Sequence, residues 1–435
     1  MIRFLTILLL AFCVSQPALS AAPTIQTNLM STAQQTSVID GIESTLRKNY
    51  IFPEKIDTIM LHLRMQPYGD TLNEEQFARE ISDRLVKASG DLHFMVGTDR
   101  AWISDIKDQD NPEKKASLES AELASQRAAN FGFKDVRILE GNVGYVRFDY
   151  FAQPDFAYQT VTSSMHIVEN ADALIIDLRY NSGGHLETAQ LLMSYLFGSE
   201  RDKKLFDYYY NQDGKRVERA QWVLPALPGP RMPDIPVYIL TGSTSFSAAE
   251  WMAFSLQSLG RAEVIGAVTA GAAHPVDRIP IDDVFFLQTP IGEIRGPAGQ
   301  GDFEGVGVQP DIAVASSTAL TVAHLAALDY LGKANTKIAW QVPLVKARAK
   351  PVVLSAAQIE CVTGQYEGRD IRLEDGTLIY RWRDRFELAL MPLSADLFAI
   401  EGVDEFRYRL ETRQGKVVGI SRVMQTGESI FYGRK

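Results

Sequence analysis

Apolar residues in the first quarter of the chain recur at spacings of three and four, which is the period of an amphipathic helix. The segments IDGIESTLRKNY and EEQFAREISDRLVKAS follow this pattern, and Asn73 can cap the second of them. We therefore expect a helical N-terminal domain over residues 23–104. The charged stretch DIKDQDNPEKKAS lacks such a period, so residues 105–118 are predicted to be a solvated linker.

Two kinds of segment alternate along the middle of the chain. Continuous apolar runs (VGYVRFDYF, DALIIDL, PVYILT, AEVIGAV) alternate with amphipathic segments such as LETAQLLMSYLF and SAAEWMAFSLQSLG. Buried strands that alternate with helices are typical of an α/β layer with a largely parallel, doubly covered sheet. Residues 119–335 should form this core, with an inserted hairpin around Asp213 and Gly214.

Beyond Pro351 the pattern changes to short alternating strands separated by turn pairs, as in IRLEDGTLIYRWRD and FRYRLETRQGKVVGISRV. This predicts a C-terminal antiparallel β module over residues 353–435, joined to the core by a linker at 336–352. The predicted fold class is α/β, in an α+β multidomain chain: a helical N-terminal domain, an α/β core and a β module.

The first 22 residues predict a secretory signal peptide. Arg3 precedes the apolar run ILLLAFCV and the small residues ALSAA, so cleavage is expected near residues 20–22, with a periplasmic or extracellular destination. Lipidation at Cys13 is disfavoured because the bulky Phe12 precedes it. No later stretch reaches the roughly 18 uninterrupted apolar residues of a membrane span. Removal of the signal leaves Cys361 alone, so no intrachain disulfide is expected.

Composition narrows the classes of partner only slightly. The formal net charge is -10, and there is no basic tract that could displace counterions from phosphates. A nucleic-acid partner is therefore not expected. The sequence leaves the oligomeric state undetermined.

The junction PVYILTGSTSFSAAEWMAFSL carries the first candidate for chemistry. Ser247 stands where a buried strand gives way to a helix that begins near Ala248, and free amides of a first helical turn stabilise an oxyanion. The competing interpretation is structural, because Ser247 and Glu250 also have the spacing of a capping box.

Two further loops could complete a site. In RYNSGGHLE, Gly183 and Gly184 permit close approach of a ligand to main-chain amides, although glycines often serve only the turn. In EGVGVQPDI, Glu304 precedes a glycine-spaced loop. Neither loop is specific alone.

Taken in order, DLRYNSGG, TSFSAAE, GRAEVIGAVTAGAAHP and FEGVGVQPDI resemble the core of the family that contains carboxyl-terminal-processing (tail-specific) peptidases, the tricorn protease core and the interphotoreceptor retinoid-binding modules. The resemblance covers roughly residues 120 to 335. It implies a core with crotonase-like layering and a serine-type peptidase with Ser247 as nucleophile. It also implies that the amides of Ala248 and of Gly183 or Gly184 form the oxyanion hole.

The resemblance further implies how the nucleophile is activated. One branch uses a lysine in the loop after the nucleophile helix, but Ala272 occupies that position here. The tricorn-like branch uses an upstream histidine and a downstream glutamate, which nominates His93 in KASGDLHFMV and Glu304. A structural histidine is the competing interpretation of His93, and His274 is the reserve base.

The predicted function is an exported serine peptidase that hydrolyses peptides or proteins through an acyl-enzyme and a Ser-His-Glu relay. The alternative is a lipid- or retinoid-type binding protein that uses the same cleft without turnover. No metal-binding or nucleotide-binding motif stands in the chain, so no cofactor is predicted.

Overall fold

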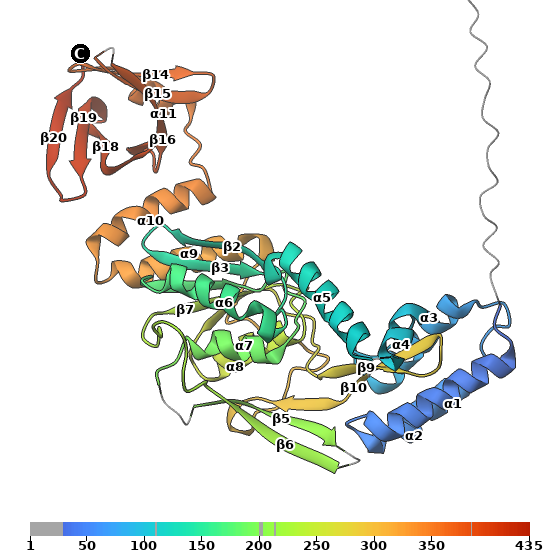
Figure 1. Ribbon diagram of the computed structural model, residues 1–435. Helices are drawn as coiled ribbons and strands as arrows, with labels where there is room; N and C mark the ends of the chain where they lie inside the picture. Colours follow the sequence, from blue (N-terminus) through green and yellow to red (C-terminus); the bar gives the residue numbers. More distant parts are fainter. Residues whose placement is uncertain (1–28, 109–110, 200–202, 213–214, 384) are drawn as a thin grey trace, which may run out of the picture.

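The computed structural model describes residues 29–108, 111–199, 203–212, 215–383 and 385–435 (Figure 1). The signal peptide predicted for residues 1–22 lies outside these ranges. Within them, no helix combines the length and the apolar character that crossing a bilayer requires.

The N-terminal region is helical, as the periodicity predicts. Its helices are α1 (Thr32–Asn49), α2 (Ile56–Arg64) and α3 (Glu74–Ser89), with the short turn η1 (Pro53–Lys55) between the first two. Asn73 caps α3 in a capping box with Gln76. These helices share a hydrophobic core with Phe285 and Leu287, which lie far along the chain in β10 (Phe285–Pro290).

A small antiparallel sheet ties this region to the centre of the molecule. Strand β1 (Met95–Thr98) pairs with β10, and β10 pairs with β9 (Val276–Pro280). The loop between α3 and β1 is therefore held against the segment that leads into β9. This loop carries one of the predicted site residues.

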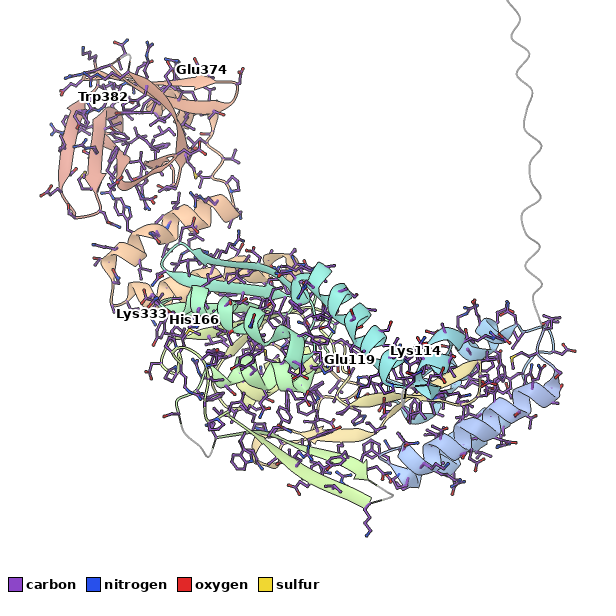
Figure 2. The ribbon with its side chains drawn as sticks, in the orientation of Figure 1. Lys114, Glu119, His166, Lys333, Glu374 and Trp382 are labelled. Atoms are coloured by element: carbon purple, nitrogen blue, oxygen red, sulfur yellow. The ribbon has the colours of Figure 1, made fainter. Side chains whose placement is uncertain are left out.

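The prediction of a linker at residues 105–118 was wrong, because this stretch is mostly helical. It contains the end of α4 (Arg100–Lys107) and the first part of α5 (Pro112–Ala128). Asn111 caps α5, because its side chain accepts hydrogen bonds from the amides of Glu113 and Lys114. Pro112 is the first residue of the helix, a position that suits proline. Lys114 and Glu119 lie along this helix (Figure 2), and most of its other side chains are exposed. High charge indicated exposure to solvent, but it did not exclude a helix.

The central sheet has six strands in the order β12-β8-β7-β4-β3-β2, parallel except for β2. Their bounds are β2 (Phe133–Leu139), β3 (Val143–Phe148), β4 (Ala173–Asp177), β7 (Val237–Thr241), β8 (Glu263–Gly266) and β12 (Ile312–Ala313). Every residue of β4 and β7 is buried, as expected for strands covered on both faces.

Successive residues of β4 serve opposite hydrophobic cores. Leu174 and Ile176 pack with α6 (Pro154–Val168), α7 (Leu186–Ser194) and α8 (Ala248–Ser258). Ala173 and Ile175 pack on the other face with α9 (Ser316–Gly332). Figure 1 shows these helices on the two sides of the sheet. The predicted parallel, doubly covered core is confirmed.

The inserted hairpin is also present. Strands β5 (Lys204–Gln212) and β6 (Lys215–Trp222) pair antiparallel, and β5 pairs with β11 (Gly292–Arg295). The turn itself, at residues 213–214, lies outside the described residues. The short turns η2 (Asn130–Gly132) and η3 (Pro297–Gly299) complete this part of the chain.

The linker predicted at residues 336–352 is instead largely helix α10 (Thr336–Ala349). Ile338 and Val345 pack into the core beside α9, while Leu344 and Ala347 pack on Leu393 of the C-terminal module. The prediction failed because both faces of this helix are apolar, each toward a different region.

The C-terminal antiparallel β module is confirmed. Eight strands follow one another around a near-barrel, and an isolated bridge between Tyr366 and Arg434 brings its first and last strands together. The elements are α11 (Ala356–Val362), β13 (Gly364–Tyr366), β14 (Arg369–Glu374), β15 (Thr377–Trp382), β16 (Phe386–Pro392), β17 (Leu397–Ile400), β18 (Val403–Arg413), β19 (Lys416–Met424) and β20 (Ser429–Gly433).

Candidate active site

Ser247 occupies a strained turn between β7 and α8. Its backbone has φ 53° and ψ -120°, a conformation that residues with a side chain rarely adopt. Such strain persists only where the surroundings impose it, and it clusters at functional sites. A serine that only caps a helix ordinarily has an extended backbone. The conformation therefore favours a chemical role over a purely structural one.

Glu250 shows that part of the capping box is nevertheless present. Its fully buried carboxylate accepts a hydrogen bond from the amide of Ser247 at 2.8 Å. It also accepts hydrogen bonds from Thr269 Oγ1 at 2.5 Å and from the amides of Gly271 and Ala272 at 2.6 and 2.9 Å. Burial raises the pKa of Glu250, and these hydrogen bonds oppose the shift. Glu250 thus ties the Ser247 turn to the loop that leads to His274.

Gly183 lies directly against Ser247. A Cβ on Gly183, whose φ is +89°, would come within 2.7 Å of Ser247 Cβ and 3.2 Å of the Ala248 amide nitrogen. The Gly183 amide already donates to Asn181 Oδ1 at 2.8 Å. Gly184, with φ +128°, is held against Phe151 by a bridge. The structure therefore brings both glycines and Ala248 to Ser247, and the Asn181 bond makes Gly184 the better candidate donor.

The substitution Gly183→Ala should lower kcat on a peptide substrate by roughly 100- to 1000-fold, because it would displace Ser247 and the amide of Ala248, one of the two proposed oxyanion donors. The added methyl would push on Ser247 Cβ and strain a left-handed backbone. Gly198→Ala is the matched control, because a Cβ there meets no atom within 4 Å. A kcat for Gly183→Ala equal to that of the control would contradict this prediction.

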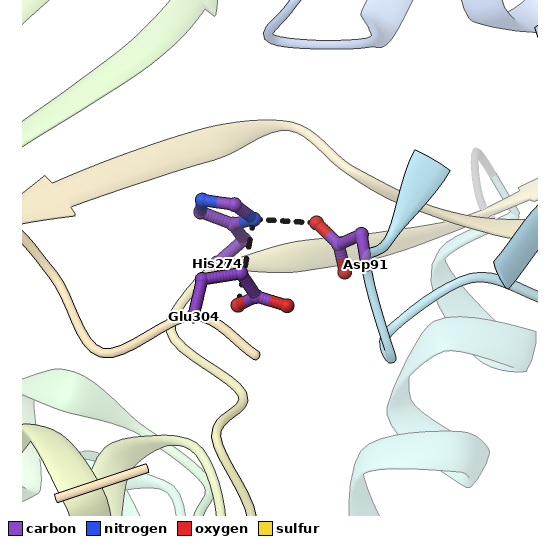
Figure 3. A group of neighbouring side chains, drawn as sticks. All are labelled: Asp91, His274 and Glu304. Atoms are coloured by element: carbon purple, nitrogen blue, oxygen red, sulfur yellow. Dashed lines mark hydrogen bonds and ion pairs between the residues drawn. The ribbon is translucent and has the colours of Figure 1, made fainter. Parts of the chain in front are cut away.

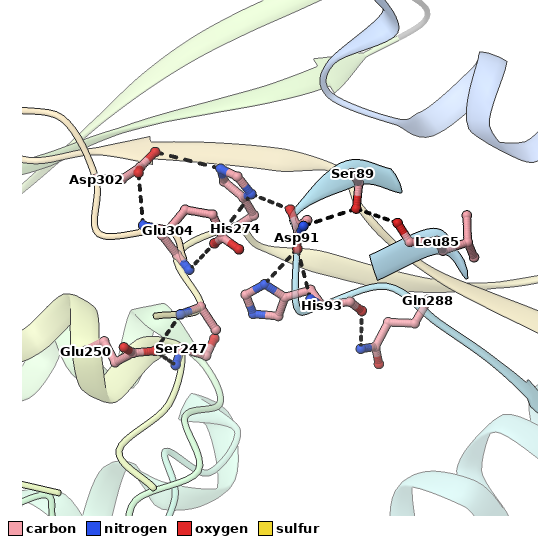
Figure 4. Close-up of polar contacts among 12 residues, drawn as sticks. Leu85, Ser89, Asp91, His93, Ser247, Glu250, His274, Gln288, Asp302 and Glu304 are labelled. Atoms are coloured by element: carbon pink, nitrogen blue, oxygen red, sulfur yellow. Dashed lines mark hydrogen bonds and ion pairs between the residues drawn. The ribbon is translucent and has the colours of Figure 1, made fainter. Parts of the chain in front are cut away.

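His93 lies in the loop between α3 and β1 and is 3% exposed. Its ring packs edge-on against Phe246, the neighbour of Ser247, with ring centroids 5.1 Å apart. His93, Ser247 and Gly184 line one pocket of about 590 Å³. Neither ring nitrogen of His93 has a hydrogen-bond partner among the described residues. The structure therefore brings the predicted base to the predicted nucleophile, without a hydrogen bond between them (Figure 4).

A neighbouring carboxylate that the sequence analysis did not single out holds the His93 loop. Asp91 Oδ1 accepts the main-chain amide of His93 at 2.9 Å and lies 3.4 Å from its Nδ1. An aspartate often accepts the amide two residues on, so the spacing D-x-H was the available signal. The carbonyl of His93 accepts a hydrogen bond from Gln288 Nε2 at 2.9 Å. Hydrogen bonds therefore hold both the main-chain amide and the main-chain carbonyl of His93.

Glu304 is placed beside His274 instead of His93. Its Oε2 accepts the amide of Ala273 at 2.6 Å and lies 3.5 Å from His274 Nδ1. Burial and the charge of Asp91 raise the pKa of Glu304. Among the described residues no hydrogen bond or ion pair joins Glu304 to His93, so the two predicted members of the relay are not in direct contact.

His274, the reserve base, lies among three carboxylates. Its Nδ1 pairs with Asp91 Oδ2 and lies near Glu304 (Figure 3). Its Nε2 is 3.7 Å from Asp302 Oδ2. Burial lowers its pKa, but Asp302, Asp91 and Glu304 outweigh burial and raise the pKa to about 10. His274 is therefore an imidazolium at neutral pH, with no free nitrogen to accept a proton from a serine.

Asp91, His274 and Glu304 each offer a ligand atom within 4.8 Å of the others, a spacing that also suits a metal ion. A histidine must be neutral to coordinate a metal. Here the imidazole of His274 carries its proton toward Asp91, whose pKa is lowered by His274 and His93 despite burial. Ion pairing with Asp91 is therefore sufficient to hold this cluster together, and a cation that bound here would have to displace the proton of His274.

Known proteins that resemble this chain are peptidases. Residues 142–314 match the model of peptidase family S41. A carboxy-terminal-processing protease of Bartonella bacilliformis is 27% identical over 180 residues, covering 40% of this chain and 39% of that protein. A carboxyl-terminal-processing protease of Synechocystis is 28% identical over 222 residues, covering 48% and 49%. The chain thus spans less than half the length of the curated relatives it matches.

Solved structures are more distant. The photosystem II D1 C-terminal processing protease is 21% identical with a TM-score of 0.32, covering 42% of this chain and 46% of that one. At this distance no residue role transfers. Ser247, Gly183, Gly184, His274 and Glu304 fall inside the residues that match the family model, whereas Asp91 and His93 precede them. Residues 142–314 of this chain are therefore similar to peptidase family S41, and the two curated relatives are both carboxyl-terminal-processing proteases.

Proposed function

We propose that this protein is a serine peptidase in which Ser247 is the nucleophile and His93 the general base. One observation carries the proposal: the strained Ser247 turn and the buried, unpartnered ring of His93 line the same pocket. A neutral imidazole suits proton abstraction near neutral pH. Catalytic hydrogen bonds are often long without substrate, so the absence of a Ser247–His93 bond is compatible with this role.

Catalysis begins when Ser247 Oγ attacks the scissile carbonyl carbon and its proton passes to His93. The amides of Ala248 and Gly184 stabilise the oxyanion. Collapse of the tetrahedral intermediate breaks the C–N bond, and His93 returns its proton to the leaving amine. Water, deprotonated by His93, then hydrolyses the acyl-enzyme and regenerates Ser247.

Glu304 takes part in this scheme through His274. Its carboxylate contributes to the negative charge that keeps His274 protonated, and His274 in turn contacts Asp91 beside His93. The Ser-His-Glu relay inferred from the sequence thus becomes an indirect one. In contrast to His93, His274 has no part in accepting the proton of Ser247.

The substrate would be a peptide or protein, and by analogy with the two relatives the cleavage would trim a carboxyl end. We also propose that the chain is exported through its N-terminal segment, as the sequence predicts. The competing function is a carrier that uses the pocket to bind an apolar ligand without turnover. The strain at Ser247 has no use in such a carrier.

A fluorophosphonate probe followed by peptide mass spectrometry tests the proposal. We expect one adduct per chain, on Ser247, and no adduct after heat denaturation of the protein before labelling. Ser243→Ala is the control, because Ser243 is exposed in the same loop. A folded protein that is labelled elsewhere or not at all would support the carrier.

A further inference from the structure

A continuous chain of polar contacts runs from His93 into the interior of the protein. Asp91 Oδ1 faces His93, and Asp91 Oδ2 faces His274 Nδ1. His274 is contacted in turn by Asp302 and Glu304 (Figure 4). The contacts join the α3–β1 loop to two loops of the core that lie about 180 residues or more later in the chain.

Burial decides how these groups are charged. Asp91, His93 and His274 are each 5% exposed or less, so water cannot screen them. A buried lone carboxylate would be costly, and a buried lone imidazolium equally so. Paired as Asp91 and His274, the two charges offset each other. Glu304, near Nδ1 of His274, and Asp302, near its Nε2, add further negative charge around the ring. Asp91 therefore remains an anion next to His93.

The side of the His93 ring that Asp91 faces determines which tautomer of His93 is favoured. Asp91 Oδ1 lies on the Nδ1 side of His93, at 3.4 Å, which is slightly longer than a hydrogen bond. A carboxylate at Nδ1 selects the tautomer that carries its proton there and leaves Nε2 free to accept. The Asp91 bond to the His93 amide fixes the two groups on the same short turn.

We propose that Asp91 is the positioning residue of the active site: it orients His93 and selects its tautomer, while the contact of His274 with Asp91 holds Asp91 in place. This inference rests on the proposed function. The acid that acts on His93 is supplied by its own loop, two residues before it. The core contributes His274, whose ion pair with Asp91 holds the α3–β1 loop over Ser247.

The pKa of His274 determines the pH range over which its ion pair with Asp91 persists. Its pKa is raised above the ordinary 6.5 to about 10, so the ion pair stabilises the fold fully below about pH 6.5 and is lost as the pH rises through about 10. The pKa of Asp91 is lowered, so its own contribution is lost only in strong acid. The ion pair between His274 and Asp91 is therefore intact at neutral pH.

Kinetics of Asp91→Asn test the role of Asp91. We expect kcat to fall by about 10²- to 10⁴-fold with KM nearly unchanged, as for loss of the acid of a serine-peptidase triad. Asp302→Asn is the matched comparison: it also touches His274 but leaves both contacts of Asp91, and should cost less than about tenfold.

An NMR titration of the histidine signals tests the ion pair between His274 and Asp91 without an activity assay. The chain has six histidines, and the signal of His274 is assigned by its loss in His274→Gln. We expect His274 to stay protonated through pH 8 in the wild-type protein. This measurement also applies if Asp91→Asn fails to fold.

Three results would overturn the inference: full kcat in Asp91→Asn, a neutral His274 at pH 7, or one equivalent of tightly bound zinc whose removal abolishes activity. If the wild-type protein reacts with the fluorophosphonate at Ser247 but Asp91→Asn keeps full activity, only this inference fails. If the wild-type protein neither reacts nor cleaves peptides, the proposed function itself fails.

Discussion

Substitution of Ser247 by alanine should reduce kcat for peptide hydrolysis by at least about four orders of magnitude. Without the hydroxyl no acyl-enzyme forms, and only the modest catalysis by the oxyanion hole and by substrate binding remains. The protein should keep its fold, because the Ser247 amide, which donates to Glu250, is retained. The measurement is steady-state hydrolysis of a peptide substrate, with the thermal midpoint as the check on folding.

The control for this experiment is Ser243→Ala, which removes an exposed hydroxyl from the same loop. It should retain the wild-type kcat. If Ser247→Ala kept more than about a tenth of the activity, the nucleophile would lie elsewhere, and the strained turn would need another explanation.

The second large effect is expected for His93→Ala, with a loss of kcat of the same order as for Ser247→Ala, since nucleophile and base act as a unit. After the loss of the imidazole, Asp91 keeps its ion pair with His274 and its hydrogen bond from the main-chain amide at position 93, so no buried charge is left without a partner. The thermal midpoint should therefore change little.

His185→Ala is the matched control, because His185 lines the same pocket but is exposed at its rim. It should keep most of the activity. Undiminished hydrolysis by His93→Ala would remove His93 from the mechanism. The assignment could not then pass simply to His274, whose nitrogens face Asp91 and Asp302.

Local pattern predicted most of the secondary structure, and its two failures share a cause. Residues 105–118 and 336–352 were predicted to be linkers, yet they lie largely in α4, α5 and α10. A charged helix exposed on most sides and a helix with two apolar faces both lack the single apolar stripe that marks an amphipathic helix. Their helical character depends on capping at Asn111 and on packing against two different regions.

The amino-acid sequence alone was enough to identify the motifs in their order, the strand-to-helix junction at Ser247 and the candidates His93, Gly183 and Gly184. These are local features, since each depends on residues that are neighbours in the chain. Which carboxylate faces which histidine depends instead on the three-dimensional fold. Asp91 and His274 stand 183 residues apart and meet because β1 pairs with β10. No spacing along a chain encodes such a contact, so Glu304 was assigned to His93 when it in fact lies against His274.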